Sequence, residues 1–133
     1  GFPNASFVDL GNPHVVAFCD DPRAMDLEAL AERLQRDPRL PEGANVHVVA
    51  LEDSGGLRVR HWERGVGLTM ACGTGAVACA AVAIEQRRVV SPVRVDVPGG
   101  RLTVEWDGRG DAFLSGPAVR VFDTEVEFVA HRD

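Results

Sequence analysis

The sequence predicts an α+β domain in which an antiparallel sheet curls around one central buried helix, with a second helix outside. Three observations lead to this prediction. Short apolar runs separated by Gly, Pro and Asn turns occupy most of the 133 residues. One further stretch has the apolar stripe of an amphipathic helix, and another has small apolar residues on every side. A composition of 45% hydrophobic and 26% charged residues is typical of one globular domain.

The first half of the chain predicts a strand pair, a helix and a hairpin. Residues 7–10 and 14–18 are β-rich runs on either side of a Gly-Asn-Pro turn. Asp26 is the expected N-cap of a helix whose apolar residues have i, i+3, i+4, i+7 spacing and which ends at the Asp37-Pro38 pair. Two further strands, over 46–51 and 57–62, are expected to form a hairpin through Ser54-Gly55-Gly56.

The second half predicts the buried helix and a run of strands. After a glycine-punctuated loop, residues 74–88 have small apolar side chains on every side, which indicates a helix with close neighbours all round. Arg87 and Arg88 at its end suit the negative pole of the helix dipole. The turn residues that follow separate expected strands over 93–97, 102–106, 112–114, 118–122 and about 125–129.

Charge and composition exclude several classes of function. The net charge of −6 argues against a nucleic-acid or anionic-membrane partner, which usually needs a basic patch. The chain contains no Lys, so it cannot supply the Schiff-base anchor of a pyridoxal phosphate enzyme. No run reaches the roughly 18 apolar residues of a membrane span, and no secretory leader is visible, so we expect a cytoplasmic protein.

The segment from Ala71 to Ala76 is the strongest candidate for chemistry. Cys72 falls at or just before the start of the buried helix, where free N–H groups and the positive end of the dipole stabilise a thiolate. At such positions the pKa of a cysteine drops from about 8.5 to roughly 3.5–7.5. The neighbouring glycines also expose amides that can hold a carboxylate. Plain small-residue packing of this cysteine is the structural alternative.

Other polar residues are weaker candidates. The Glu63-Arg64 pair precedes the cysteine turn, and its charges suit an ammonium and a carboxylate, although such pairs are often only surface ion pairs. Cys19 and Cys79 are interpreted as structural. Asn12, His14 and Asn45, each taken alone, are more typical of turn chemistry or of satisfied polar residues. His47, His61 and His131 lack the spacing of metal ligands, so no metal site is expected.

Several motifs, in order and over nearly the whole chain, resemble the second half of the diaminopimelate epimerases. The most specific is the block from Glu63 to Ala76, Glu-Arg-Gly-Val-Gly-Leu-Thr-Met-Ala-Cys-Gly-Thr-Gly-Ala. The likeness continues in four shorter motifs: Gly11-Asn12-Pro13-His14, Ala44-Asn45-Val46, Val97-Pro98-Gly99-Gly100 and Ser115-Gly116-Pro117-Ala118.

This resemblance implies a cofactor-independent enzyme that interconverts L,L- and meso-diaminopimelate, a precursor of lysine and peptidoglycan. Two similar α+β domains close over the substrate, and each donates one cysteine that removes or returns the α-proton. Cys72 is then one of the two cysteines, with His14 and Glu63 adjusting the cysteine pKa values. The distal end of the substrate is implied to contact Asn12, Asn45, Glu63 and Arg64, while the amides of Gly73 and Thr74 hold the α-carboxylate.

The other cysteine and its loop belong to the family's first half, which this sequence does not include. Residues 1–133 are therefore expected to be one C-terminal domain whose partner is the N-terminal domain of the same enzyme. Alone, the domain is expected to be inactive, and we expect the full-length enzyme to form a homodimer. Two alternatives stay open: a proline-racemase-like isomerase, which uses a similar Cys-Gly-Thr-Gly turn, and a non-catalytic domain that binds a partner and leaves Cys72 unreactive.

Overall fold

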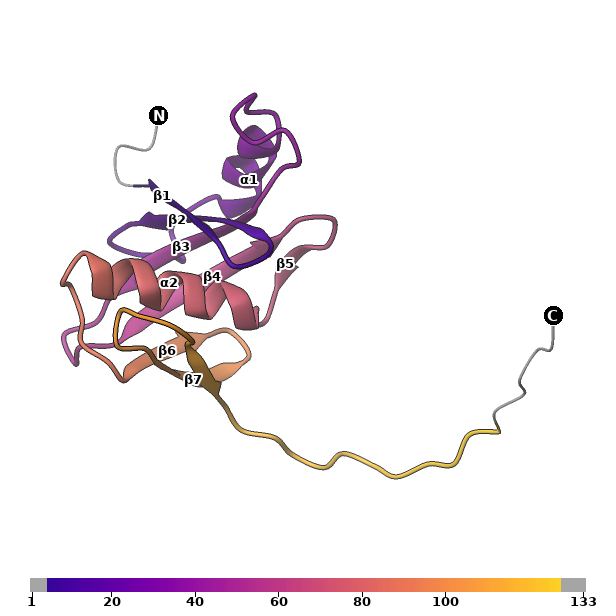
Figure 1. The fold of residues 1–133 in the computed structure, drawn as a ribbon. Coiled ribbons are helices and arrows are strands. Elements are labelled where there is room, and N and C mark those ends of the chain that lie inside the picture. The colour runs from indigo at the N-terminus through magenta and orange to yellow at the C-terminus, as the bar shows by residue number, and fades with distance from the viewer. Residues whose placement is uncertain (1–4, 128–133) are drawn as a thin grey trace.

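The computed structural model describes residues 5–127, which form one curled sheet and two helices (Figure 1). The strand order is β1-β2-β3-β4-β6-β7-β8, with β5 paired to β4 on the side of this path. The elements are β1 (Ala5–Asp9), β2 (Pro13–Phe18), α1 (Leu27–Gln35), β3 (Asn45–Leu51), β4 (Leu57–Glu63), β5 (Gly67–Thr69), α2 (Gly73–Glu85), β6 (Val93–Val97), β7 (Gly100–Glu105) and β8 (Phe113–Ser115). The predicted α+β class is confirmed. Neither helix is long and apolar enough to cross a membrane.

The sheet is mixed, whereas the sequence predicted an antiparallel one. β2 runs parallel to β3, and β4 runs parallel to β6. In both cases a helix lies between the two strands along the chain, so the connection returns in the same direction and the strands align in parallel. The other pairings over the described residues are antiparallel, including the predicted β3–β4 hairpin. The short strand β5 lies in a segment expected to be a loop.

Helix α2 lies in the hollow of the curled sheet, as predicted (Figure 1). Its small side chains allow strands from both ends of the sheet to approach, and most of them are buried in the main hydrophobic cluster. The helix ends at Glu85, earlier than expected. Arg87 has a positive φ of 56° and lies beyond the last turn, so the prediction that it complements the helix dipole is wrong. Arg88 instead lies 4.2 Å from the centre of the Phe18 ring.

Helix α1 covers the opposite face of the sheet. Its apolar stripe packs on β3 in a second cluster formed by Leu27, Leu30, Ala31, Val46 and Val48. The predicted N-cap is confirmed, because Asp26 Oδ1 accepts a hydrogen bond of 3.0 Å from Ala29 N–H. The two helices therefore divide the sheet into an α2 face and an α1 face, and neighbouring residues of each strand point to different faces.

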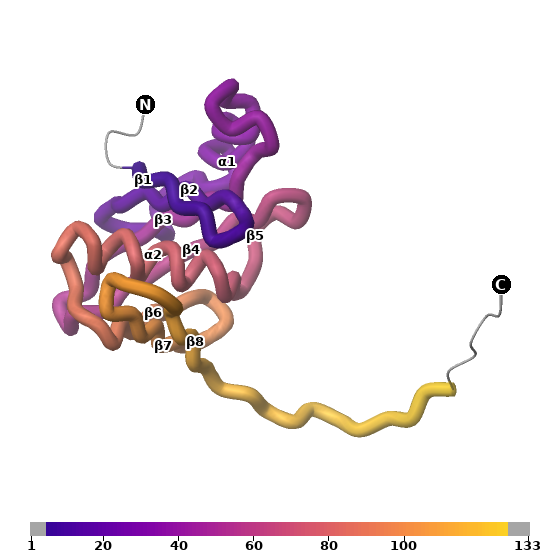
Figure 2. Tube along the Cα trace, viewed as in Figure 1, coloured from indigo at the N-terminus to yellow at the C-terminus, as the bar shows by residue number. Residues whose placement is uncertain are grey.

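The chain continues beyond β8 as an extended segment that runs away from the domain (Figure 2). Residues 116–127 contain no strand, so the predicted strand over 118–122 and the described part of the one near 125–129 are wrong; positions 128 and 129 lie outside the described residues. A strand needs a hydrogen-bonding neighbour. Here β8 occupies the edge of β7, and residues 116–127 pair with no strand of the described domain. Val119 and Val121 of this segment are 82% and 85% exposed.

Candidate active site

Cys72 caps the N-terminus of α2, as its sequence context predicted. Its backbone is extended, with φ −135° and ψ 112°, and the helix starts at the next residue. The Cys72 sulfur accepts a hydrogen bond of 3.4 Å from Gly75 N–H and lies 3.8 Å from Thr74 Oγ1. The side chain is 7% exposed. The sulfur therefore sits just below the surface, next to two donors of the first helical turn.

The pKa of Cys72 is raised, and the predicted lowering is wrong. Burial is the largest cause, because it penalises the charged thiolate. The Gly75 N–H and the Thr74 hydroxyl act in the other direction, by donating hydrogen bonds to the sulfur. Glu63 raises the pKa further, as a nearby negative charge and as an acceptor for the thiol. In this domain Cys72 is therefore a protonated thiol at neutral pH.

The turn after β1 meets the first turn of α2 beside the sulfur. Asn12 Nδ2 donates to Thr74 Oγ1 at 3.4 Å, and Asn12 Oδ1 lies 3.0 Å from His14 Nε2. His14 is fully buried, and burial lowers its pKa, while Asp9 and Glu63 oppose that effect. The structure thus brings together Asn12, His14, Thr74 and Cys72, four of the residues singled out from the sequence.

The remaining candidates lie at the edge of this cluster. Asn45 is buried on β3, opposite His14 in the register, and its Oδ1 accepts a hydrogen bond of 3.0 Å from Arg64 N–H. The Arg64 guanidinium donates to the Glu42 carbonyl at 2.5 Å, so it lies against the loop before β3. Gly73 is exposed at the start of α2.

Two histidines that sequence reasoning set aside are part of the cluster. His47 Nε2 lies 2.8 Å from His14 Nδ1, and His47 Nδ1 lies 2.8 Å from His61 Nδ1. Both rings are buried, and burial lowers the pKa of His47 to about 2 and that of His61 to about 4. The alternation along β4 did indicate that His61 is buried, because Leu57, Val59 and His61 share one face of the strand and that face is buried.

Helix α2 leaves room for these rings only because residue 75 is glycine. A Cβ atom at Gly75 would lie 2.5 Å from His47 Cε1 and 3.0 Å from His61 Nδ1. Over residues 5–127 no group of three or more His, Cys, Asp or Glu side chains could hold a metal ion. The histidines instead form a row of pairwise contacts.

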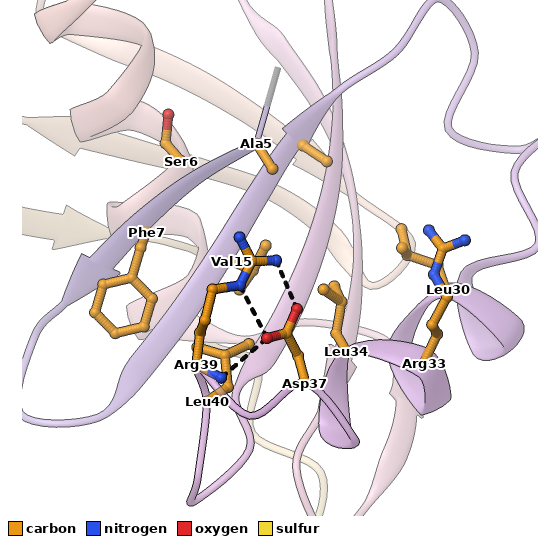
Figure 3. Close-up of a pocket in the computed structure, with 11 residues that line it drawn as sticks. Ala5, Ser6, Phe7, Val15, Leu30, Arg33, Leu34, Asp37, Arg39 and Leu40 are labelled. Carbon is orange, nitrogen blue, oxygen red and sulfur yellow. Dashed lines mark hydrogen bonds and ion pairs between the residues drawn. The ribbon is translucent and has the colours of Figure 1, made fainter. Parts of the chain in front are cut away.

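A hollow of the described domain lies away from Cys72. It has a volume of about 570 Å³ and lies on the α1 face, between β1 and α1 (Figure 3). Phe7 and Leu40 contribute apolar walls, and the Asp37–Arg39 ion pair lies beside them (Figure 3). Val15 and Ala17 line this hollow, whereas Val16 packs with α2 and His14 contacts His47, which lies against Gly75 of α2. It is therefore separated from the cysteine by the sheet.

Comparison with known proteins places this geometry in a family. Residues 6–121 match the family described as diaminopimelate epimerase. A diaminopimelate epimerase of Rhizorhabdus wittichii is 47% identical over 122 residues, which is 92% of this chain and 44% of the relative. One from Sphingopyxis alaskensis is 47% identical over 121 residues, with 91% and 45% covered, and one from Pseudomonas entomophila is 46% identical over 120 residues, with 90% and 44% covered.

Solved structures support the same fold at lower identity. A putative phenazine biosynthesis PhzC/PhzF protein from Clostridium difficile superposes with a TM-score of 0.56 at 20% identity, covering 79% of this chain and 39% of that one. A PhzF family protein from Bacillus anthracis gives a TM-score of 0.58 at 16% identity, covering 83% and 37%. The chain spans less than half the length of the curated relatives it matches. By the family match and by its identity to these relatives, this chain belongs to the diaminopimelate epimerase family.

Proposed function

We propose that this chain is the C-terminal domain of a cofactor-independent diaminopimelate epimerase and that Cys72 is one of its two acid–base residues. The position of Cys72 carries the proposal: a shallowly buried thiol at a helix N-terminus, with hydrogen-bond donors on one side and Glu63 nearby. The relatives named diaminopimelate epimerase supply the substrate class.

The reaction exchanges one proton for another at the α-carbon. A thiolate on one face removes the α-proton, and the thiol on the opposite face delivers its own proton to the carbon. The raised pKa of Cys72 makes it the proton donor of the resting domain, and its sulfur becomes a thiolate after donation. In the reverse reaction that thiolate is the base. Gly75 N–H and Thr74 lie where they stabilise it in both directions.

The amides at the start of α2 suit the substrate carboxylate at the reacting carbon. Gly73 and Thr74 are exposed, and free amides at a helix N-terminus attract an anion. The other binding residues of this proposal are Asn12, Asn45, Glu63 and Arg64, at the distal end of the substrate. For Arg64 this requires its guanidinium to leave the Glu42 carbonyl.

The second cysteine belongs, in this proposal, to an N-terminal domain that covers the rim around Cys72. Exposed apolar side chains on that rim support a partner there. Met70, two residues before Cys72 in the chain, is 64% exposed, and Leu114 on β8 is 42% exposed. Leu114 Cδ2 lies 3.2 Å from where a Cβ at Gly73 would stand, which places this side chain beside the site. A cytoplasmic location fits the need for reduced thiols. A homodimer of the full-length enzyme stays a prediction that sedimentation can test.

The decisive experiment is α-proton exchange in D₂O with meso- and L,L-diaminopimelate. The chain is tested when joined to the N-terminal half that its relatives carry, beside a Cys72→Ala variant of the same protein. We expect exchange that disappears in the variant, and no epimerisation by residues 1–133 alone. Exchange only with a different amino acid would assign the chain to a sister racemase. No exchange with any amino acid, or full exchange in the variant, would overturn the proposal.

A further inference from the structure

The buried histidines form one continuous hydrogen-bonded row that ends at the catalytic sulfur. From the core outward, the contacts join His61 to His47 and His47 to His14, each at 2.8 Å, and His14 to Asn12 at 3.0 Å. Asn12 then contacts Thr74 at 3.4 Å, and Thr74 contacts the Cys72 sulfur at 3.8 Å. Neither His47 nor His61 has a role in the proposed function.

Each link needs one donor and one acceptor, so the whole row has only two possible directions. A neutral imidazole has one N–H and one bare nitrogen, and a carboxamide has one oxygen and one NH₂ group. In the outward direction each group donates toward Asn12 Oδ1, and Asn12 Nδ2 donates to Thr74 Oγ1. The Thr74 hydroxyl hydrogen is then free for the Cys72 sulfur. In the inward direction the Asn12 amide turns over and the Thr74 hydroxyl donates to Asn12 instead.

The inner end of the row decides between the two directions. His61 Nε2 is buried and has no hydrogen-bond partner among residues 5–127. In the outward direction this atom is a bare nitrogen, whereas in the inward direction it is a buried N–H without an acceptor. Orphaned buried N–H groups are rarer than unsatisfied acceptors. The outward direction is also the one in which Asn12 Oδ1 faces His14 and Nδ2 faces Thr74.

We propose that His47 and His61 are positioning residues: they close the row with a buried end at which the described residues offer no acceptor for an N–H, and this fixes the direction of the row and keeps the Thr74 hydroxyl donating to the Cys72 sulfur. The row does not conduct protons, since it passes through an amide at Asn12 and its inner end, His61 Nε2, has no partner in the part of the chain that the structure describes. That Cys72 is the reacting group rests on the proposed function; the direction of the row does not.

The surroundings of the row keep all three imidazole rings neutral. Burial lowers the pKa of His14, of His47 and of His61, so none carries a charge at neutral pH. The charged groups that face the row are Asp9 and Glu63, which act on His14. Glu63 and the buried Cys79 are the titratable neighbours of Cys72.

The direct test is ¹⁵N–¹H correlation spectroscopy of the imidazole rings in the 133-residue chain at pH 7. We expect His14 and His47 to carry their proton on Nε2 and His61 to carry its proton on Nδ1. A proton on Nδ1 of His14 or His47, or an imidazolium at any of the three, would overturn the proposal. This measurement uses the unmodified chain, so it does not depend on a variant that folds.

The second test uses an isosteric pair of substitutions at the end of the row, His61→Thr and His61→Val. A threonine hydroxyl, directly or through one water, can accept from His47 Nδ1 and donate elsewhere, so the inward direction becomes available. Valine leaves the end of the row dry and keeps the outward direction. We expect His14 to show two tautomers in the threonine variant and one in the valine variant.

The effect of the same two variants on Cys72 is then measured as the pH midpoint of its alkylation, resolved by peptide. Thr74→Val removes the hydroxyl outright and is expected to raise the alkylation midpoint by about one pH unit, since a hydrogen bond to a charged group has that effect. His61→Thr is expected to raise it by about half a unit, because the two directions become comparably populated, while His61→Val leaves it unchanged. In a Thr74→Val background, His61→Thr should add no further shift.

Equal midpoints in the two His61 variants, or a shift by His61→Thr that persists in the Thr74→Val background, would overturn the proposal. Neither spectroscopy nor alkylation needs turnover. A failure to exchange the α-proton of diaminopimelate would therefore count against the proposed function alone, and a wrong tautomer would count against the row alone.

Discussion

Gly75→Ala tests whether the buried histidine row and the first turn of α2 are fitted to each other. Alanine at this position places a Cβ 2.5 Å from His47 Cε1 and 2.9 Å from His47 Nε2, which is closer than carbon atoms pack. The ring has no free direction to move in, because His47 is fully buried and hydrogen-bonded on both sides. The added methyl group therefore has to displace the ring, the helix or both.

The expected cost follows from two opposing effects. Overpacking a well-filled core typically costs about 1–3 kcal/mol. Replacing a helical glycine by alanine returns about 1 kcal/mol. We therefore expect a net loss of up to about 2 kcal/mol in the free energy of unfolding, which corresponds to a fall of up to about 8 °C in Tm for a chain of this length.

Gly73→Ala is the matched control, two residues earlier in the same turn. Among residues 5–127, a Cβ there meets Leu114 Cδ2 alone, at 3.2 Å, and this is the end of a flexible side chain that is 42% exposed. Its effect on Tm should be near zero or slightly positive. Thermal unfolding followed by circular dichroism measures both variants. If Gly75→Ala were as stable as Gly73→Ala, or if it cost as much in a His47→Ala background, the steric argument would be refuted.

Three further predictions concern stability and thiol reactivity. The unfolded chain protonates His47 and His61 below about pH 6.5, whereas the folded chain keeps them neutral down to about pH 2 and about pH 4. The free energy of unfolding should therefore fall by about 1.4 kcal/mol per pH unit for each ring below pH 6.5; a urea midpoint unchanged between pH 7 and pH 5 would contradict this. Cys79 is fully buried with a strongly raised pKa, so mass spectrometry should find it unalkylated until the chain unfolds. Asp26→Ala removes the cap on Ala29 N–H and should cost about 1 kcal/mol in chemical unfolding, against no loss in Asp26→Asn.

Local patterns were enough to predict most of the elements. The turn at Gly11-Asn12-Pro13, the cap at Asp26 and the β3–β4 hairpin depend on residues close together in sequence, and the structure contains all three. The parallel pairings were missed because direction depends on where a helix returns the chain. The strand expected over 118–122 has suitable residues, yet within the described chain it lacks a neighbour to pair with.

In the site, too, the features that were predictable have local causes, and the features that were not have tertiary causes. The N-cap position of Cys72 and its contact with Gly75 N–H follow from a short motif, and both were predictable. The direction of its pKa shift was not, because burial by distant elements outweighs the donors of the first helical turn. Tertiary structure also explains why the contact between the histidines was not predicted. His47 and His61 are 14 residues apart and meet through the β3–β4 register.

In the proposed function the Cys72 sulfur gives and takes a proton, and the donors beside it oppose the effect of burial on its pKa. A sulfur that must both give and take a proton works best when neither form is strongly favoured. Burial and Glu63 favour the thiol, while the Gly75 amide and the Thr74 hydroxyl favour the thiolate. The amide is fixed by the helix, but a hydroxyl rotates, so its contribution depends on what else it contacts. In the proposal made above, Asn12 and the buried rings hold that hydroxyl on the sulfur, so that a rotatable donor behaves like a fixed one.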